Sequence, residues 1–255
     1  MFVGLKLFRM KKWIIILLVS LISSSWSFPL ITSDPNPVVR HLPVMNVNVY
    51  MMGRQDVDAK VTIKINENIE YLNEAFKGFI KFNFNELFMD PNHAYLPDLY
   101  KKFGTKTTEP IVEPLINQIE KEGSINIYLF DTYCEEGTNA ALMGFTPLLR
   151  AKQQSYLSLS PKFDRILMAY EGLQENKTLV HEMGHFFGLK HPWEMTIAAK
   201  YQLGIKNDTD EVKNHMSYGH EVEEFTNQQL EFMRQNALRY RSYLMDRIVK
   251  VYAKA

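Results

Sequence analysis

The chain has 255 residues, 46% of them hydrophobic, so it is long enough to bury a substantial core after a leader is removed. Its 29 Lys and Arg residues balance 29 Asp and Glu residues, which excludes an overall attraction to nucleic acid or to an acidic membrane surface. The single cysteine, Cys134, excludes an internal disulfide.

Residues 1–27 have the pattern of a signal peptide. Basic residues up to Lys12 precede the apolar run from Trp13 to Ile22, and small serines before Phe28 offer a cleavage site. The run is shorter than the roughly 20 residues that a spanning helix needs, so we expect no stable membrane span. The sequence therefore predicts a secreted or periplasmic protein.

The next segment, residues 28–43, is rich in proline and is expected to be an extended arm or a short pro-segment with little structure of its own. Residues 45–51 then alternate apolar and polar side chains, which predicts a strand with one apolar face. Apolar residues recur at helical spacing from Ile65 to Phe76, and residues 80–84 alternate again. Strand, helix and strand in this order predict a parallel βαβ unit.

Further elements follow toward the middle of the chain. A helix around Ile111 to Lys121 is expected to lead into a strand at residues 125–130. Residues 156–160 alternate with serines, as an exposed edge strand would. Another strand at residues 165–170 precedes a helix whose first turn Asn176 or Thr178 can cap.

The segment from residue 181 to residue 191 carries the chemistry. His181 and His185 are four residues apart, so on a helix both imidazoles reach one ion, and Glu182 lies beside them. Gly188 allows the backbone to leave the helix, so that His191 can return as a third ligand. A fourth position left to water is typical of a catalytic zinc site. The alternative, a buried helix whose histidines only pack, leaves the carboxylate among apolar neighbours unexplained.

A second motif follows at residues 214–219. Its Asn-x-Met-x-Tyr pattern consists of Asn214, Met216 and Tyr218. Together with the three histidines it resembles the Met-turn of the metzincin clan of zinc metallopeptidases, and it looks most like the pappalysin (cytophagalysin) branch. The resemblance implies that Met216 supplies an apolar floor under the imidazoles. It also implies that Tyr218 binds the zinc or stabilises the transition state.

The resemblance implies an α+β, zincin-like fold for a catalytic domain at residues 44–255. Its upper subdomain, residues 44–188, would hold a twisted mixed sheet with a backing helix and the active-site helix. The smaller C-terminal subdomain, residues 189–255, would hold the Met-turn and a closing helix from Asn227 to about Tyr252. Residues 144–147 also look like a loop of pappalysin-type sequences.

The chain departs from this family in one respect, since pappalysin-like enzymes commonly carry disulfides between the third histidine and the Met-turn. Two residues have either an ordinary role or a role in latency. Cys134 is either a small buried thiol or a latency ligand for zinc, and Asp34 is either an ordinary turn residue or a zymogen cap.

The sequence predicts a secreted zinc-dependent endopeptidase in which Glu182 is the general base and a protein or peptide is the substrate. The edge strand at 156–160 could pair with an extended peptide. Two alternatives remain: an exported zinc-binding domain without catalysis, and a zinc hydrolase of a non-peptide substrate. Calcium near Asp208, Asp210 and Glu211 is an alternative to a solvated acidic loop.

Overall fold

The computed structural model describes residues 38–52, 58–90, 116, 118–130, 143–146, 165–219 and 221–253. Residues Val39–Ala253 form one compact unit. The predicted signal peptide, Asp34, Cys134 and the edge strand expected at residues 156–160 lie outside the described residues, as does most of the helix expected at 111–121. Within the described ranges, none of the helices combines the length and apolar character needed to cross a membrane.

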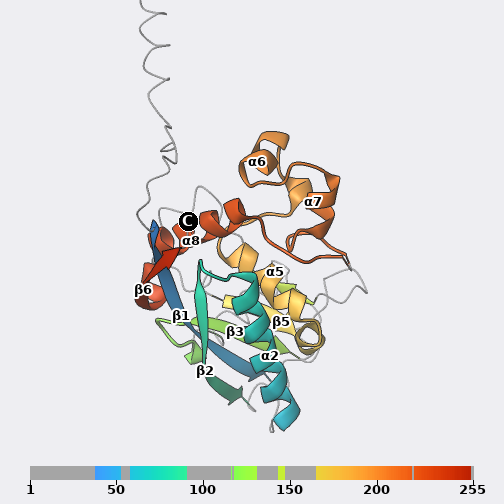
Figure 1. Cartoon of the computed structure of the whole chain (residues 1–255). Helices are drawn as coiled ribbons and strands as arrows, with labels where there is room; N and C mark the ends of the chain where they lie inside the picture. The colour runs from blue at the N-terminus through green and yellow to red at the C-terminus, as the bar shows by residue number, and fades with distance from the viewer. Residues whose placement is uncertain are drawn as a thin grey trace, which may run out of the picture. The chain divides into compact units, whose positions relative to one another are not determined.

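The α+β class expected from the sequence is confirmed by the order of the elements (Figure 1). The strands are β1 (Val38–Met52), β2 (Lys81–Asp90), β3 (Ile125–Phe130), β4 (Gly144–Phe145), β5 (Arg165–Ala169) and β6 (Met245–Ala253). The α-helices are α2 (Ala59–Ala75), α5 (Asn176–Phe186), α6 (Ile197–Gln202), α7 (Asp208–Lys213) and α8 (Asn227–Tyr240). Short 3-10 turns are η4 (Tyr170–Leu173), η5 (Pro192–Glu194) and η6 (Ser242–Leu244).

The strands form one mixed sheet in the order β2-β1-β3-β5-β4, with β6 paired to β1. β1 pairs with β2 and with β3 in parallel, and β3 pairs with β5 in parallel. The predicted βαβ unit is therefore confirmed. β4 pairs with β5 in the antiparallel sense, which makes β4 the edge of the described sheet on that side. β1 begins at Val38, inside the range that was expected to be an extended arm.

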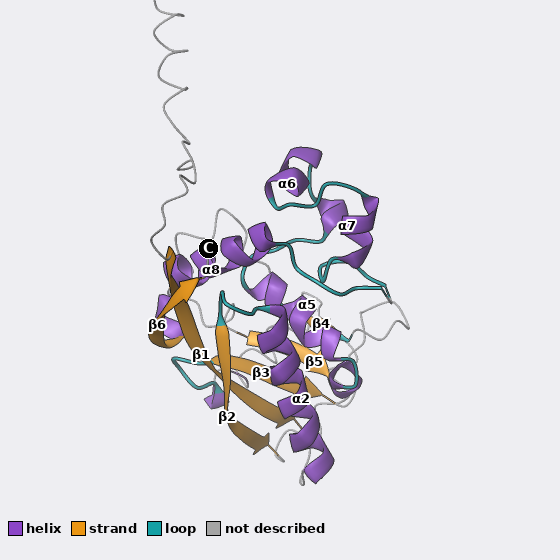
Figure 2. Cartoon of the chain, in the orientation of Figure 1, coloured by secondary structure: helices purple, strands orange, loops and turns teal. Residues whose placement is uncertain are grey.

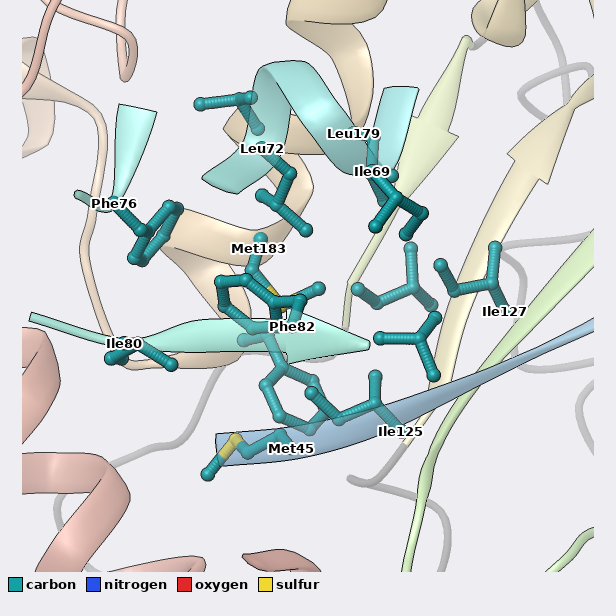
Figure 3. Packing of buried hydrophobic residues seen from close by; sticks show 14 of the residues in the cluster. Met45, Ile69, Leu72, Phe76, Ile80, Phe82, Ile125, Ile127, Leu179 and Met183 are labelled. Atoms are coloured by element: carbon teal, nitrogen blue, oxygen red, sulfur yellow. The ribbon is translucent and has the colours of Figure 1, made fainter. Parts of the chain in front are cut away.

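Two helices cover one face of this sheet. α2 and α5 contact each other, and Figure 2 shows them side by side in front of the strands. Figure 3 shows how their apolar side chains meet the sheet: Ile69 and Leu72 of α2 and Leu179 and Met183 of α5 gather over Phe82, Ile125 and Ile127. Each large apolar side chain that is fully buried contributes about 1.5–3 kcal/mol, so this cluster fixes α5 firmly against the strands.

The expected N-cap of α5 was wrong. Its N-cap residue is Glu175, whose side chain makes no capping hydrogen bond, and Asn176 is already the first residue of the helix. Thr178 donates its backbone N–H to the carbonyl of Glu175 at 3.0 Å rather than capping with its hydroxyl. Packing of the apolar face onto α2 and the sheet holds this helix start in place of a side-chain cap.

The expected end of the closing helix was also wrong. α8 ends at Tyr240, and residues 245–253 form β6 instead of continuing the helix to about Tyr252. Arg241 leaves the helical conformation with φ −128° and ψ 24°. The tail then carries Ile248, Val249 and Val251, β-branched residues that favour a strand once a partner strand is present. β1 supplies that partner.

Candidate metal centre and active site

α5 carries three of the predicted site residues on a helix that is otherwise packed into the core. His181, Glu182 and His185 are all buried, beside the apolar Leu179, Val180 and Met183 that anchor the helix. Periodicity places both histidines on one helix face, one turn apart. Their backbone positions are therefore set by the same packing that fixes the helix.

The helix ends in a turn that brings the chain back toward the histidines. Gly188 has φ +94°, in the left-handed region that favours glycine. Leu189 donates its N–H to the carbonyl of Gly184 at 2.9 Å, as in a Schellman motif. Asn236 of α8 donates to the carbonyl of Phe187 at 2.8 Å, and Arg241, directly after α8, donates to that of Phe186 at 3.0 Å. These bonds satisfy carbonyls that the helix leaves without partners.

The structure brings His181, His185 and His191 together. Nε2 of His191 lies 3.3 Å from Nε2 of His181 and 3.1 Å from Nε2 of His185. One ligand atom from each of the three lies within 4.8 Å of the other two. Among the described residues this is the cluster of His, Cys, Asp and Glu side chains that could hold a metal ion.

The hydrogen bonds of the Nδ1 atoms determine which ring nitrogen of each histidine is available to bind a metal ion. Nδ1 of His181 donates to the carbonyl of His215 at 2.7 Å, and Nδ1 of His185 donates to the carbonyl of Leu189 at 2.8 Å. A carbonyl only accepts, so Nδ1 carries the proton and each Nε2 keeps its lone pair. Burial lowers the pKa of His181 to about 3 and that of His185 to about 4, so both rings are neutral at pH 7.

The donor set fits a zinc ion. Converging lone pairs on neutral imidazoles repel one another unless a cation lies between them. Zinc bonds imidazole nitrogen at about 2.0–2.1 Å, which separates two nitrogens of a tetrahedral site by about 3.3 Å. The Nε2 separations of 3.3 and 3.1 Å at His191 agree with that spacing.

Glu182 is held from the edge strand. It is 5% exposed, and its Oε2 accepts a 2.7 Å hydrogen bond from the hydroxyl of Thr146. Burial raises the pKa of Glu182 to about 7, while the Thr146 bond acts in the opposite direction. Gly144 makes room for this side chain, because a Cβ at that position would lie 2.6 Å from Cγ of Glu182. The carboxylate is therefore positioned by Gly144 of β4, which leaves space for it, and by Thr146 after β4, which donates a hydrogen bond to it.

Met216 is fully buried and packs against α5 at Gly184, where a Cβ would collide with the Met216 sulfur. The loop that carries it is held by Asn214, which accepts from the backbone N–H of Met216 at 3.0 Å. The side-chain amides of Asn214 and Gln229 exchange hydrogen bonds of 2.7 and 3.1 Å, which tie the loop to α8. Met216 thus lies beside the residue that precedes His185.

Tyr218 lies over the histidine cluster at the surface. Its hydroxyl is 3.0 Å from Nε2 of His191, and its ring centroid is 5.3 Å from that of His181. The side chain is 73% exposed. Desolvation of the hydroxyl, which lies against His191, followed by the charges of Glu182 and Glu194, raises the pKa of Tyr218, so the hydroxyl keeps its proton at neutral pH.

The acidic residues considered for calcium do not form a site in the described part of the chain. Asp208, Asp210 and Glu211 lie in the first turn of α7. Glu211 pairs with Lys200 at 2.5 Å, and Asp210 accepts from the backbone N–H of Lys206 at 2.8 Å. Two of the three carboxylates are thus already engaged, and the calcium interpretation is not supported.

Sequence reasoning assigned no role to three residues near the site, although one of them, Thr146, lies in the segment 144–147 that resembles a pappalysin-type loop. Thr146 contacts a residue 36 positions away, and no spacing rule predicts such a contact. Trp193 stacks on the ring of His191 with centroids 4.4 Å apart. Glu194 bonds the same histidine, and the spacing of three residues, typical of a capping box, could have found it.

The sequence matches no protein-family model and no curated protein. Among solved structures, the chain is similar to archaemetzincin from Methanopyrus kandleri, with a TM-score of 0.46 and 16% identity over 82% of this chain and 100% of that one. It is also similar to metalloproteinase-II from Bacteroides fragilis, with a TM-score of 0.40 and 12% identity over 84% of this chain and 55% of that one.

The fold and the site together define an α+β protein with a three-histidine candidate metal centre. A buried glutamate lies next to the first histidine, and an exposed tyrosine lies over the third.

Proposed function

We propose that this protein is a zinc-dependent endopeptidase. The observation that carries the proposal is the convergence of the Nε2 atoms of three histidines, together with a buried carboxylate on Glu182, the residue after His181 on α5. A purely structural zinc site needs four protein ligands and no base, whereas a catalytic site keeps three ligands and an open position. His181, His185 and His191 would hold the ion. When bound, zinc polarises the scissile carbonyl and makes the attacking water more acidic.

Glu182 acts as the general base and then as the general acid. Thr146 holds its Oε2, which leaves Oε1 to take the proton from the attacking water. In the chain without metal, burial raises the pKa of Glu182 to about 7, so this carboxylate is a stronger base than an exposed glutamate. The returned proton goes to the leaving amine as the carbon–nitrogen bond breaks.

Tyr218 supplies a hydrogen-bond donor at the mouth of the site. Its hydroxyl remains protonated, and its exposure leaves it free to move from Nε2 of His191 toward the oxyanion that develops on the scissile carbonyl. A hydrogen-bond donor that reaches the developing oxyanion stabilises the transition state of acyl transfer, by about 2.7–4 kcal/mol in one measured case.

The substrate is a protein or peptide in an extended conformation. Thr146, directly after β4, holds Glu182, and β4 is the edge of the sheet among the described residues, so an extended peptide paired with β4 would lie beside the base. Residues 156–160, for which the sequence predicts such an edge, lie outside the described residues. The proposal includes export through a signal peptide at residues 1–27. It also includes membership of the pappalysin-like branch, which is supported by the pattern of Asn214, Met216 and Tyr218.

The experiment is a digestion of a peptide library by the purified protein, with and without a zinc chelator. We expect cleavage that the chelator abolishes and added zinc restores. Glu182→Gln should keep its zinc and lose nearly all turnover, whereas Glu67→Gln, on an exposed face of α2, should match the wild type. Full cleavage by Glu182→Gln would remove the base from the proposal.

The same assay separates the alternatives. Zinc bound at one equivalent with no cleavage of any peptide would identify a zinc-binding domain without catalysis. Chelator-sensitive hydrolysis of esters or other amides, with peptides left intact, would identify a hydrolase of non-peptide substrates.

A further inference from the structure

The third histidine lies in a different structural setting from the other two. His181 and His185 are buried in the packed helix α5, and their Nδ1 atoms donate to backbone carbonyls. His191 lies outside any helix, with φ −62° and ψ 145°, as the N-cap residue of η5. Its side chain is 14% exposed. An imidazole on such a segment can turn about its terminal bond, because that torsion is broad.

Two residues in the turn after His191, Trp193 and Glu194, restrain this ring. Oε2 of Glu194 accepts from Nδ1 of His191 at 3.1 Å and from its backbone N–H at 3.2 Å. The indole of Trp193 stacks on the imidazole with a centroid distance of 4.4 Å and an interplanar angle of 7°. Glu194 therefore restrains rotation of the ring and selects its tautomer, while Trp193 covers one ring face.

We propose that Glu194 is a positioning residue for the third metal ligand, His191, and that the stacked indole of Trp193 fixes the plane of the imidazole ring. The carboxylate keeps the proton on Nδ1 and directs Nε2 of His191 toward the Nε2 atoms of His181 and His185. The inference rests on the metal centre of the proposed function, but not on peptide cleavage.

A purely structural role for Glu194 is the competing reading, since it also caps η5 by bonding the backbone of His191. The two readings differ in what they predict for zinc. A capping residue stabilises the turn whether or not a metal binds. A positioning residue changes metal affinity and coordination geometry even when the fold is intact.

The test measures zinc affinity of the full chain by competition with a chromogenic chelator. Partners that orient metal-bound histidines typically contribute about 10–100-fold to metal affinity, so Glu194→Ala should weaken zinc binding by about that factor. Glu194→Gln should lose less, because its amide oxygen still accepts from Nδ1. Trp193→Phe should bind zinc more tightly than Trp193→Ala, because it keeps a stacked ring.

Glu67→Ala is the matched control. Glu67 is also an i,i+3 partner of a basic side chain and is similarly exposed, at 45% against 41% for Glu194. The metal-free thermal midpoints of all variants show whether each one folds. Substitution of Co²⁺ for zinc adds a spectroscopic readout, and the visible spectrum of Glu194→Gln should differ from that of the wild type.

Zinc affinity and a cobalt spectrum in Glu194→Ala equal to those of Glu67→Ala would overturn the proposal. The proposal would also be overturned if zinc affinity fell only in those variants whose metal-free thermal midpoint is lowered, and in proportion to that lowering. If the wild type binds zinc through His191 but cleaves no peptide, the endopeptidase proposal fails while the role of Glu194 is still tested.

Discussion

The hydroxyl of Thr146 donates a 2.7 Å hydrogen bond to Oε2 of Glu182, and so joins the loop after β4 to helix α5. The bond is buried and engages one of the two carboxylate oxygens. A hydrogen bond to a charged group contributes about 1.5–3 kcal/mol, enough to decide how this side chain is oriented.

Replacing Thr146 by valine removes the hydroxyl and keeps the shape of the side chain. We expect peptidase activity to fall by about tenfold or more, because about 1.4 kcal/mol of lost orientation energy is a factor of ten in rate. Zinc content should not change. Steady-state kinetics with elemental analysis checks this, with Thr62→Val on α2 as the control. Equal kcat/KM values in the two variants would argue against a role for the Thr146 bond.

Gly144→Ala should displace the base. The new Cβ would lie 2.6 Å from Cγ and 2.8 Å from Oε1 of Glu182, closer than carbon atoms approach without a shift. We expect activity near that of Glu182→Gln while zinc stays bound, measured by the same kinetics and metal analysis. Gly219→Ala is the control, because its Cβ meets nothing within 4 Å. Wild-type turnover by Gly144→Ala would mean that the carboxylate does not need its present position.

His191→Ala removes the third nitrogen donor. Only His181 and His185 would remain as protein ligands, whereas a catalytic zinc site needs three. We expect the zinc stoichiometry after dialysis to fall well below one, as determined by elemental analysis. An unchanged stoichiometry would show that another residue is the third ligand.

Arg241→Met tests how the end of α5 is held. Arg241 is buried, donates to the carbonyl of Phe186 at 3.0 Å and stacks over its ring at 3.7 Å. Methionine keeps much of the packing but leaves the carbonyl without this donor, which costs about 1–3 kcal/mol. Urea unfolding should show that loss in the free energy of unfolding. Arg247→Met, on the exposed part of β6, should change it little.

His215 should make the metal-free protein sensitive to acid. Burial, with the charge of Lys177 adding to it, lowers the pKa of His215 from 6.5 to about 4. The folded state then binds fewer protons than the unfolded state between these pH values. The contribution of neutral His215 to the free energy of unfolding is fully present above pH 6.5. About 3 kcal/mol of it is lost as pH falls to about 4.

Urea unfolding of metal-free wild type and His215→Phe at several pH values isolates this group. Phenylalanine suits the site, where the imidazole meets Tyr71 and Phe225 edge-on. The variant should gain stability relative to the wild type as pH falls from 6.5 toward 4. Glu182, whose pKa is raised to about 7, makes the folded state more stable as pH falls, but this contribution is present in both proteins and cancels when their free energies of unfolding are subtracted. A pH-independent difference would contradict the assignment.

Much of the architecture was predictable because it follows from short-range periodicity. The alternation at residues 45–51 and the helical repeat from Ile65 to Phe76 correspond to β1 and α2, since a side chain's face depends only on its own backbone period. The spacing of His181 and His185 likewise fixes two imidazoles on one face of α5 without reference to the rest of the fold.

Other features were decided by contacts between distant segments. The bond from Thr146 to Glu182 joins residues 36 positions apart, and the pairing of β6 with β1 joins the two ends of the described chain. No local pattern encodes such contacts, because they exist only once the sheet and α5 have packed. The sequence alone determined which side chains could bind a metal. The tertiary structure decided what holds them, because backbone carbonyls and partners from other elements become available only in the folded chain.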